Sequence, residues 1–162
     1  MRARLGSDGR SGERAIAAAQ CLSTLQRDNG GWPWLYDVVR GEVVEPFEIY
    51  SVHQDGMAPM AFHEISVATG MDTKKIVNRG LKWLYGENEL ATNMIDESNG
   101  LIYRSIRRKP TQARASLYWR TFMSAAGVPR HGEPRPSYLE INPTCRPYHL
   151  GWILEAWCKE PS

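Results

Sequence analysis

The sequence predicts an all-α protein with about five to six helices joined by long, aromatic-rich loops. Apolar residues recur at helical spacing in five segments, and most of these segments carry a start or stop signal. No long run alternates between apolar and polar residues as a half-buried strand does. The chain has 162 residues, of which 42% are hydrophobic and 23% charged, close to globular averages. This is enough for one domain with its own core.

Each predicted helix follows from periodicity and punctuation. Glycines at positions 70, 86 and 127 mark three of the ends, and Pro147 marks the start of the last helix. Short runs over Glu42–Val44 and Leu101–Tyr103 could form small hairpins within the loops. The predicted helices run from about Glu13 to Gln26, from about Met57 to Thr69, from Asp72 or Thr73 to Gly86, from Gln112 to Ala126, and from Pro147 onward.

Composition limits the class of protein. Residues 1–12 are polar and lack the apolar segment of a signal peptide, so we expect a flexible leader before a single domain over residues 13–162 in a cytoplasmic protein. The apolar runs are far shorter than the roughly 20 residues that a membrane helix needs. Three cysteines outside any Cys-x-x-Cys motif indicate neither a disulfide framework nor a metal site, and we expect no cofactor. A net charge of +2 does not favour nucleic acid.

Two long loops separate the predicted helices, and charge is segregated between them. Residues 27–56 contain five large aromatic side chains, and loops of that length are often functional. Residues 28–55 hold six acids and one base, a net charge of −5, whereas residues 101–132 hold seven bases and no acid, a net of +7. Either these segments face each other, or they form the two walls of a cleft.

One motif resembles a known family. The segment from Gln26 to Trp32 reads Gln-Arg-Asp-Asn-Gly-Gly-Trp and resembles the Q-x-x-x-G-x-W core of the repeat in squalene and hopene cyclases. A second, partial copy about 62 residues later matches at Arg79, Gly80, Trp83 and Leu84, but has Asn88 where Gln is expected. In that family the Gln caps a neighbouring helix and the Trp stacks on it.

The resemblance implies a partial α/α-toroid of antiparallel helical hairpins. This design is shared by terpenoid cyclases, protein prenyltransferases and six-hairpin glycan-processing enzymes. A full toroid has about twelve helices, so five or six would make an incomplete arc, a piece of a longer chain, or an arc completed by self-association or by a larger protein partner. The acid motif of the hopene cyclases and the zinc ligands of the prenyltransferases have no counterparts here.

The candidate catalytic residues lie in the first long loop. They are two acids just before the second predicted helix, the histidine between them and one earlier acid, namely Asp55, Glu48, His53 and Asp37. Carboxylates and an imidazole in one segment suit general acid–base chemistry, and two carboxylates suit glycoside cleavage. Asp55 or Ser51 could instead cap the helix that follows.

Aromatic and basic residues are candidate ligand-binding groups. Aromatic rings can stack on a sugar, and arginines can hold a phosphate or a carboxylate. The candidates are Trp32, Trp34, Tyr50, Tyr103, Arg104 and Arg107. The first hypothesis is therefore a carbohydrate- or nucleotide-sugar-processing or -binding module with a small-molecule or oligosaccharide ligand. One alternative is a terpenoid or prenyl-diphosphate-handling module, and another is a non-catalytic helical-repeat module that binds a partner.

Overall fold

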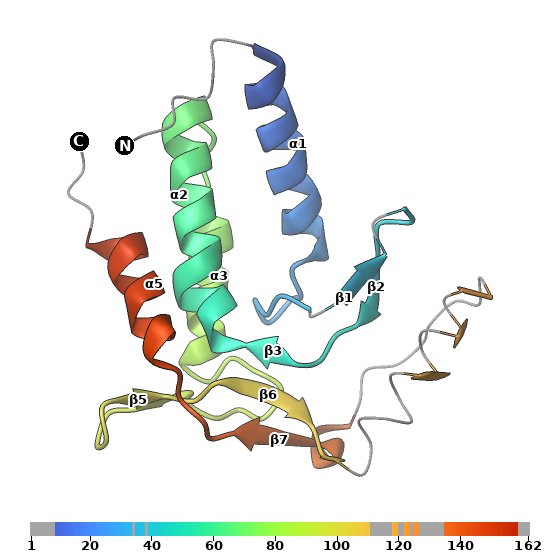
Figure 1. Ribbon diagram of the computed structural model, residues 1–162, viewed down its shortest axis with the longest axis vertical. Coiled ribbons are helices and arrows are strands. Elements are labelled where there is room, and N and C mark those ends of the chain that lie inside the picture. Colours follow the sequence, from blue (N-terminus) through green and yellow to red (C-terminus); the bar gives the residue numbers. More distant parts are fainter. Residues whose placement is uncertain are drawn as a thin grey trace.

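The computed structural model describes residues 9–33, 35–37, 39–110, 118–119, 122–123, 125–126 and 135–158 (Figure 1). In that part of the chain it has four α-helices and seven strands in three antiparallel sheets. The prediction of an all-α partial toroid is therefore wrong, and so is the family membership that implied it. The protein is a mixed α/β protein in which a small sheet packs below a group of helices.

The predicted helices are largely confirmed. They are α1 (Gly9–Leu25), α2 (Ala58–Thr69), α3 (Lys74–Leu84) and α5 (Pro147–Trp157), and α1 begins four residues before its predicted start. Gly70 ends α2 in the left-handed conformation, with φ of 75°, and donates its N–H to Ser66. The fourth predicted helix lies mostly outside the described residues. Local signals located these helices because caps and periodicity act within a few residues.

A three-stranded sheet is the part of the fold that the sequence did not predict. It consists of β3 (Ile49–Tyr50), β6 (Ser105–Arg108) and β7 (Leu139–Asn142), in the order β3-β6-β7. The register pairs Ile49 with Ile106 and Ile106 with Ile141, so one face of the sheet is apolar. On the next row Tyr50, Ser105 and Asn142 lie side by side and give the other face a polar row.

Two hairpins complete the strands. β1 (Leu35–Asp37) pairs with β2 (Glu42–Glu45), and β4 (Ile95–Asp96) pairs with β5 (Leu101–Ile102). Both short runs that the sequence singled out as hairpin strands are thus in hairpins. Figure 1 shows the β1–β2 hairpin projecting beside the lower end of α1.

Two apolar clusters form the core. The first lies between the apolar face of the sheet and α3, and the second lies among α1, α2 and α3. The buried members of the first are Phe47, Ile49, Trp83, Leu84, Met94, Ile106 and Leu139. Those of the second are Ala19, Trp32, Phe62 and Val77. Burying such side chains provides most of the favourable free energy of folding.

A short π-helical segment, η1 (His53–Met57), joins β3 to α2 and packs against α2, α3 and α5. Gly56 allows the close approach of α5, because a Cβ atom there would lie 2.8 Å from Cβ of Trp152. Gly80 on α3 allows the close approach of the Trp32 side chain, because a Cβ atom there would lie 2.9 Å from Cζ3 of Trp32. Single π-helical turns of this kind occur frequently at functional sites.

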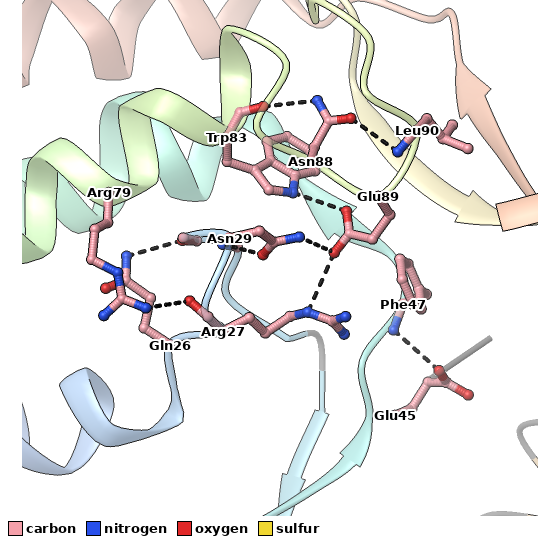
Figure 2. Close-up of polar contacts among 12 residues, drawn as sticks. Gln26, Arg27, Asn29, Glu45, Phe47, Arg79, Trp83, Asn88, Glu89 and Leu90 are labelled. Carbon is pink, nitrogen blue, oxygen red and sulfur yellow. Dashed lines mark hydrogen bonds and ion pairs between the residues drawn. The ribbon is translucent and has the colours of Figure 1, made fainter. Parts of the chain in front are cut away.

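The segment that resembled a repeat motif ties α1 to α3 (Figure 2). Gln26 donates from Nε2 to the carbonyl oxygens of Gly30 and Ile76, at 2.9 and 3.1 Å. Beside it, the Glu89 carboxylate accepts hydrogen bonds from Asn29 at 2.9 Å and from the Trp83 indole at 3.0 Å. In this fold the motif is therefore a structural connection between a loop and a neighbouring helix.

Candidate functional site

The polar row of the three-stranded sheet holds a carboxylate in place. Glu48 directly precedes β3, and its Oε1 accepts hydrogen bonds from Ser105 Oγ at 3.2 Å and Asn142 Nδ2 at 3.3 Å. Its other oxygen accepts the hydroxyl hydrogen of Tyr50. The side chain remains partly exposed. Three donors from three strands therefore orient a carboxylate that solvent can still reach.

The Tyr50 ring is the centre of this cluster. The guanidinium carbon of Arg104 lies 5.3 Å from the ring centroid, and the His53 ring centroid lies 5.4 Å from it. We call Glu48, Tyr50, His53 and Arg104, together with the two residues that hold Glu48, the Tyr50 site. All four of these named side chains are partly exposed.

The environment separates the pKa values of two groups in the Tyr50 site. Burial, and then the hydrogen bond to Glu48, raise the pKa of Tyr50 to about 12. Burial lowers the pKa of His53 below its ordinary value of 6.5. At neutral pH the phenol is therefore protonated and the imidazole is neutral. Pairs of groups whose pKa values are pushed apart in this way suit the roles of acid and base.

Arg104 differs from the two other arginines of its segment. Arg107 donates from Nε to Glu140 at 2.9 Å, and Arg108 forms a buried ion pair with Glu45 at 3.0 Å. Arg104 forms no ion pair with a carboxylate of the described residues, and its buried Nε has no hydrogen-bond acceptor there. The guanidinium beside Tyr50 thus keeps its charge available for an anion.

The Glu45–Arg108 pair also bears on the segregated charges. Glu45 belongs to the acidic segment 28–55 and Arg108 to the basic segment 101–132. Both Nε and Nη2 of Arg108 donate to Oε1 of Glu45, at 3.2 and 3.0 Å. The two segments therefore do face each other at this buried pair, as one of the two interpretations of the sequence expected.

A second carboxylate, Asp55, is buried against α5. Its Oδ1 lies 2.6 Å from Nε2 of His149, and the two residues are 6% and 3% exposed. The backbone oxygen of Asp55 accepts a hydrogen bond from the Trp157 indole at 2.6 Å. Burial raises the pKa of Asp55, and the bond to His149 opposes that rise. Its Oδ2 is buried and has no hydrogen-bond donor among the described residues.

This position bears on the capping role that the sequence offered as one alternative for Asp55. Neither α2 nor η1 has a side-chain cap, so Asp55 does not cap the helix. Ser51, the other candidate cap, donates to the carbonyl oxygen of Tyr103 at 2.5 Å. The partner of Asp55 is His149 on α5 rather than His53, its neighbour in the sequence.

The remaining predicted catalytic residue and the predicted tryptophans lie elsewhere. Asp37 is in the β1–β2 hairpin, where its Oδ1 accepts the backbone N–H groups of Val39 and Arg40 at 2.9 and 3.0 Å. Trp32 is in the second core cluster, stacked on Phe62 with ring centroids 5.8 Å apart. Trp34 lies outside the described residues.

Tyr103 and Arg107 flank the Tyr50 site on the same stretch of chain as Arg104. The Tyr103 hydroxyl donates to Asp96 at 3.1 Å, which ties it to the β4–β5 hairpin. Arg107 lies two residues beyond Ser105 on β6, on the same face of the sheet, and pairs across the sheet with Glu140. The structure therefore brings together Glu48, His53, Tyr50 and Arg104 from the predicted set.

Sequence analysis missed Ser105, Asn142 and His149. The first two lie on short strands that alternate between polar and apolar residues, Ser105-Ile106-Arg107 and Glu140-Ile141-Asn142. That alternation is the ordinary strand signal, although each run is very short. No local signal in the sequence links His149 to Asp55, because the two residues are 94 positions apart.

Comparison with known proteins leaves the function open. No family model matches this chain, and no curated protein and no solved structure matches it significantly. In the described part of the chain, no group of three His, Cys, Asp or Glu residues is arranged to hold a metal ion. None of the described helices has the length and apolar character needed to cross a membrane. The Tyr50 site is therefore the basis on which we infer a function.

Proposed function

We propose that this protein binds an acidic sugar at the Tyr50 site and removes the proton from the carbon next to the sugar's carboxylate. One observation carries the proposal. A neutral imidazole and a guanidinium that has no carboxylate partner among the described residues both lie within 5.5 Å of one protonated phenol ring. This set contains an anion-binding group, a base and an acid.

Arg104 would bind the sugar carboxylate. A guanidinium binds a carboxylate through two parallel hydrogen bonds, which fixes both the position and the orientation of the anion. Neutralising the carboxylate also makes the neighbouring C–H bond more acidic, because negative charge develops on the carboxylate oxygens as the proton leaves. The absence of an ion pair at Arg104 among the described residues supports this role.

His53 and Tyr50 would be the base and the acid. A neutral imidazole can accept the proton from carbon, and the lowered pKa of His53 keeps it neutral at pH 7. Tyr50 retains its proton and could donate it to a leaving sugar oxygen. The electron pair of the C–H bond would then form a carbon–carbon double bond as the bond to that oxygen breaks. Glu48 would orient the phenol through the hydrogen bond that it accepts.

Glycoside hydrolysis has less support than proton abstraction. A hydrolase needs two carboxyl groups about 5 to 9 Å apart. Of the predicted carboxylates, Asp55 is buried against His149, and Asp37 accepts hydrogen bonds within its own hairpin. Of these three predicted carboxylates, Glu48 alone lies in the Tyr50 site, and a hydrolase would need a second one beside it.

The test uses the full chain with galacturonic acid oligomers and, as matched neutral ligands, galactose oligomers of the same length. We expect the uronate oligomers to raise the melting temperature. At a hundredfold excess over Kd, binding should add about 2.7 kcal/mol to the free energy of unfolding. Elimination would appear as ultraviolet absorbance from the new double bond. Epimerisation would appear as solvent deuterium on the sugar without that absorbance.

Variants separate binding from chemistry. Arg104→Gln should weaken uronate binding about tenfold or more, whereas His53→Gln should retain binding and lose turnover. Arg107→Gln is the matched control, because that guanidinium on β6 already pairs with Glu140, and it should change binding by less than about twofold. Equal binding of neutral and acidic oligomers, or unchanged binding by Arg104→Gln, would contradict the proposal. Preferential binding of geranyl diphosphate would favour the terpenoid alternative.

A further inference from the structure

Between β6 and β7, the described residues 118–119, 122–123 and 125 are helical, and three of them carry exposed aromatic side chains. Tyr118, Trp119 and Phe122 are 76%, 63% and 64% exposed, and the rings of Trp119 and Phe122 lie 6.2 Å apart. Helical spacing puts these three side chains on one face, which continues with Met123 and Ala126. Figure 1 shows the described pieces of this stretch away from α1, α2, α3 and α5.

The sequence around this face is strongly basic. Residues 109–135 contain five bases, namely Lys109, Arg114, Arg120, Arg130 and Arg135, against the single acid Glu133, which makes a net charge of +4. Lys109 and Arg135 are exposed in the structure. The neighbouring Arg108 lies outside this range, and its charge is balanced by the ion pair with Glu45.

We propose that the aromatic face, defined as Tyr118, Trp119 and Phe122, docks on an anionic lipid surface. Amphipathic helices with aromatic side chains on one face and basic residues around it lie in the interface between headgroups and acyl chains. Tyrosine and tryptophan favour that depth because their rings are apolar and their tips are polar. Negatively charged headgroups complement the net charge of +4 over residues 109–135.

Two other occupants fit the observations less well. A second copy of the same stretch would bring two net charges of +4 together, which opposes association. A single-stranded nucleic acid would stack bases on the rings, but Met123 and Ala126 extend the face with side chains that have no π system. Hydrocarbon suits that whole face better than bases do.

The test is co-sedimentation of the full chain with vesicles of phosphatidylcholine alone or of phosphatidylcholine with phosphatidylserine. We expect binding to the vesicles that contain phosphatidylserine, weakening as salt is added. Replacing one basic residue, as in Lys109→Gln, should lower the partition coefficient about fivefold. The double variant Trp119→Ser/Phe122→Ser should lower it about tenfold or more, since both rings leave the interface.

The matched control is Tyr85→Ser, because Tyr85 is 66% exposed but lies at the end of α3, outside the basic stretch. We expect it to bind vesicles like the wild type. Circular dichroism and melting curves should show that all variants fold, since the replaced side chains are exposed. Three results would overturn the proposal: no preference for anionic vesicles, unchanged binding by the double variant, or a dimer in sedimentation velocity that the double variant abolishes. Tighter binding to single-stranded polynucleotide than to vesicles would also overturn it.

Discussion

Glu48 and Asp55 are seven residues apart, yet the structure gives them opposite surroundings. Glu48 accepts hydrogen bonds from three side chains on three strands and stays partly exposed. Asp55 is buried with a single histidine and has one oxygen without a donor among the described residues. Two carboxylates close together in the sequence can therefore have different roles, because burial and the hydrogen-bond donors around a carboxylate determine its charge state and contacts.

The two regions differ in whether their polar groups are accessible to solvent or are used to join elements of the fold. The Tyr50 site leaves polar groups where a ligand could meet them. The Asp55–His149 contact instead joins η1 to the first turn of α5. The Trp157 indole adds a second connection by donating a hydrogen bond to the backbone oxygen of Asp55. Loss of a group should thus affect ligand binding in the first region and folding stability in the second.

The largest expected effect separates the two carboxylates by stability. Asp55→Ala should reduce the free energy of unfolding by about 3 kcal/mol, because His149 is left buried without its partner. Glu48→Gln should reduce it by less than about 1 kcal/mol, since the amide oxygen can still accept from Ser105 and Asn142. Chemical denaturation of both variants, followed by circular dichroism, measures the difference. Equal losses would show that the two carboxylates have the same structural importance.

A glycine pair sharpens the assignment of α5 to the structural region. Gly56→Ala should destabilise the protein by about 2 kcal/mol, because the added Cβ would lie 2.8 Å from Cβ of Trp152 and α5 would have to move. Gly151→Ala on α5 is the control, since among the described residues no heavy atom outside its chain neighbours and its own helix backbone lies within 4 Å of the added Cβ. We expect it to stabilise α5 by up to about 1 kcal/mol through helix propensity. Melting temperatures that decrease equally for both variants would contradict the close packing of η1 on α5.

The smallest expected effect is a pair of opposite pH dependences within η1. The pKa of Asp55 is raised above its unfolded value of 3.8, so its contribution to stability is complete below pH 3.8 and is lost as pH rises through the native pKa. The pKa of His53 is lowered from 6.5, so its contribution is complete above pH 6.5 and is lost as pH falls through the native pKa.

Melting temperatures measured between pH 3.8 and pH 6.5 test both signs. On acidification, Asp55→Asn should lose stability more steeply than the wild type, because it lacks the compensating gain at Asp55. His53→Gln should lose stability less steeply, because no buried imidazole has to be charged. Curves for both variants that run parallel to the wild type would rule out these two groups as determinants of the pH dependence.

Local and long-range features differ in how far the sequence predicted them. Periodicity, glycines and prolines, which act over a few residues, located four helices, and two short runs located one strand of each hairpin. The sheet was missed because β3 has two residues and β6 and β7 have four each, too few for a period to stand out. The repeat motif misled because one glutamine and one tryptophan can tie a loop to a helix in more than one fold.

The sequence by itself determined where the helices form, how charge is divided between two segments, and that a carboxylate, a phenol and an imidazole lie close together in one stretch. Only the tertiary structure decided that Tyr50, Ser105 and Asn142 share one row, and that Asp55 meets His149, which is 94 residues away. The physical reason is that helix formation depends on neighbours along the chain. The partners, burial and protonation of a side chain depend on segments that only folding brings together.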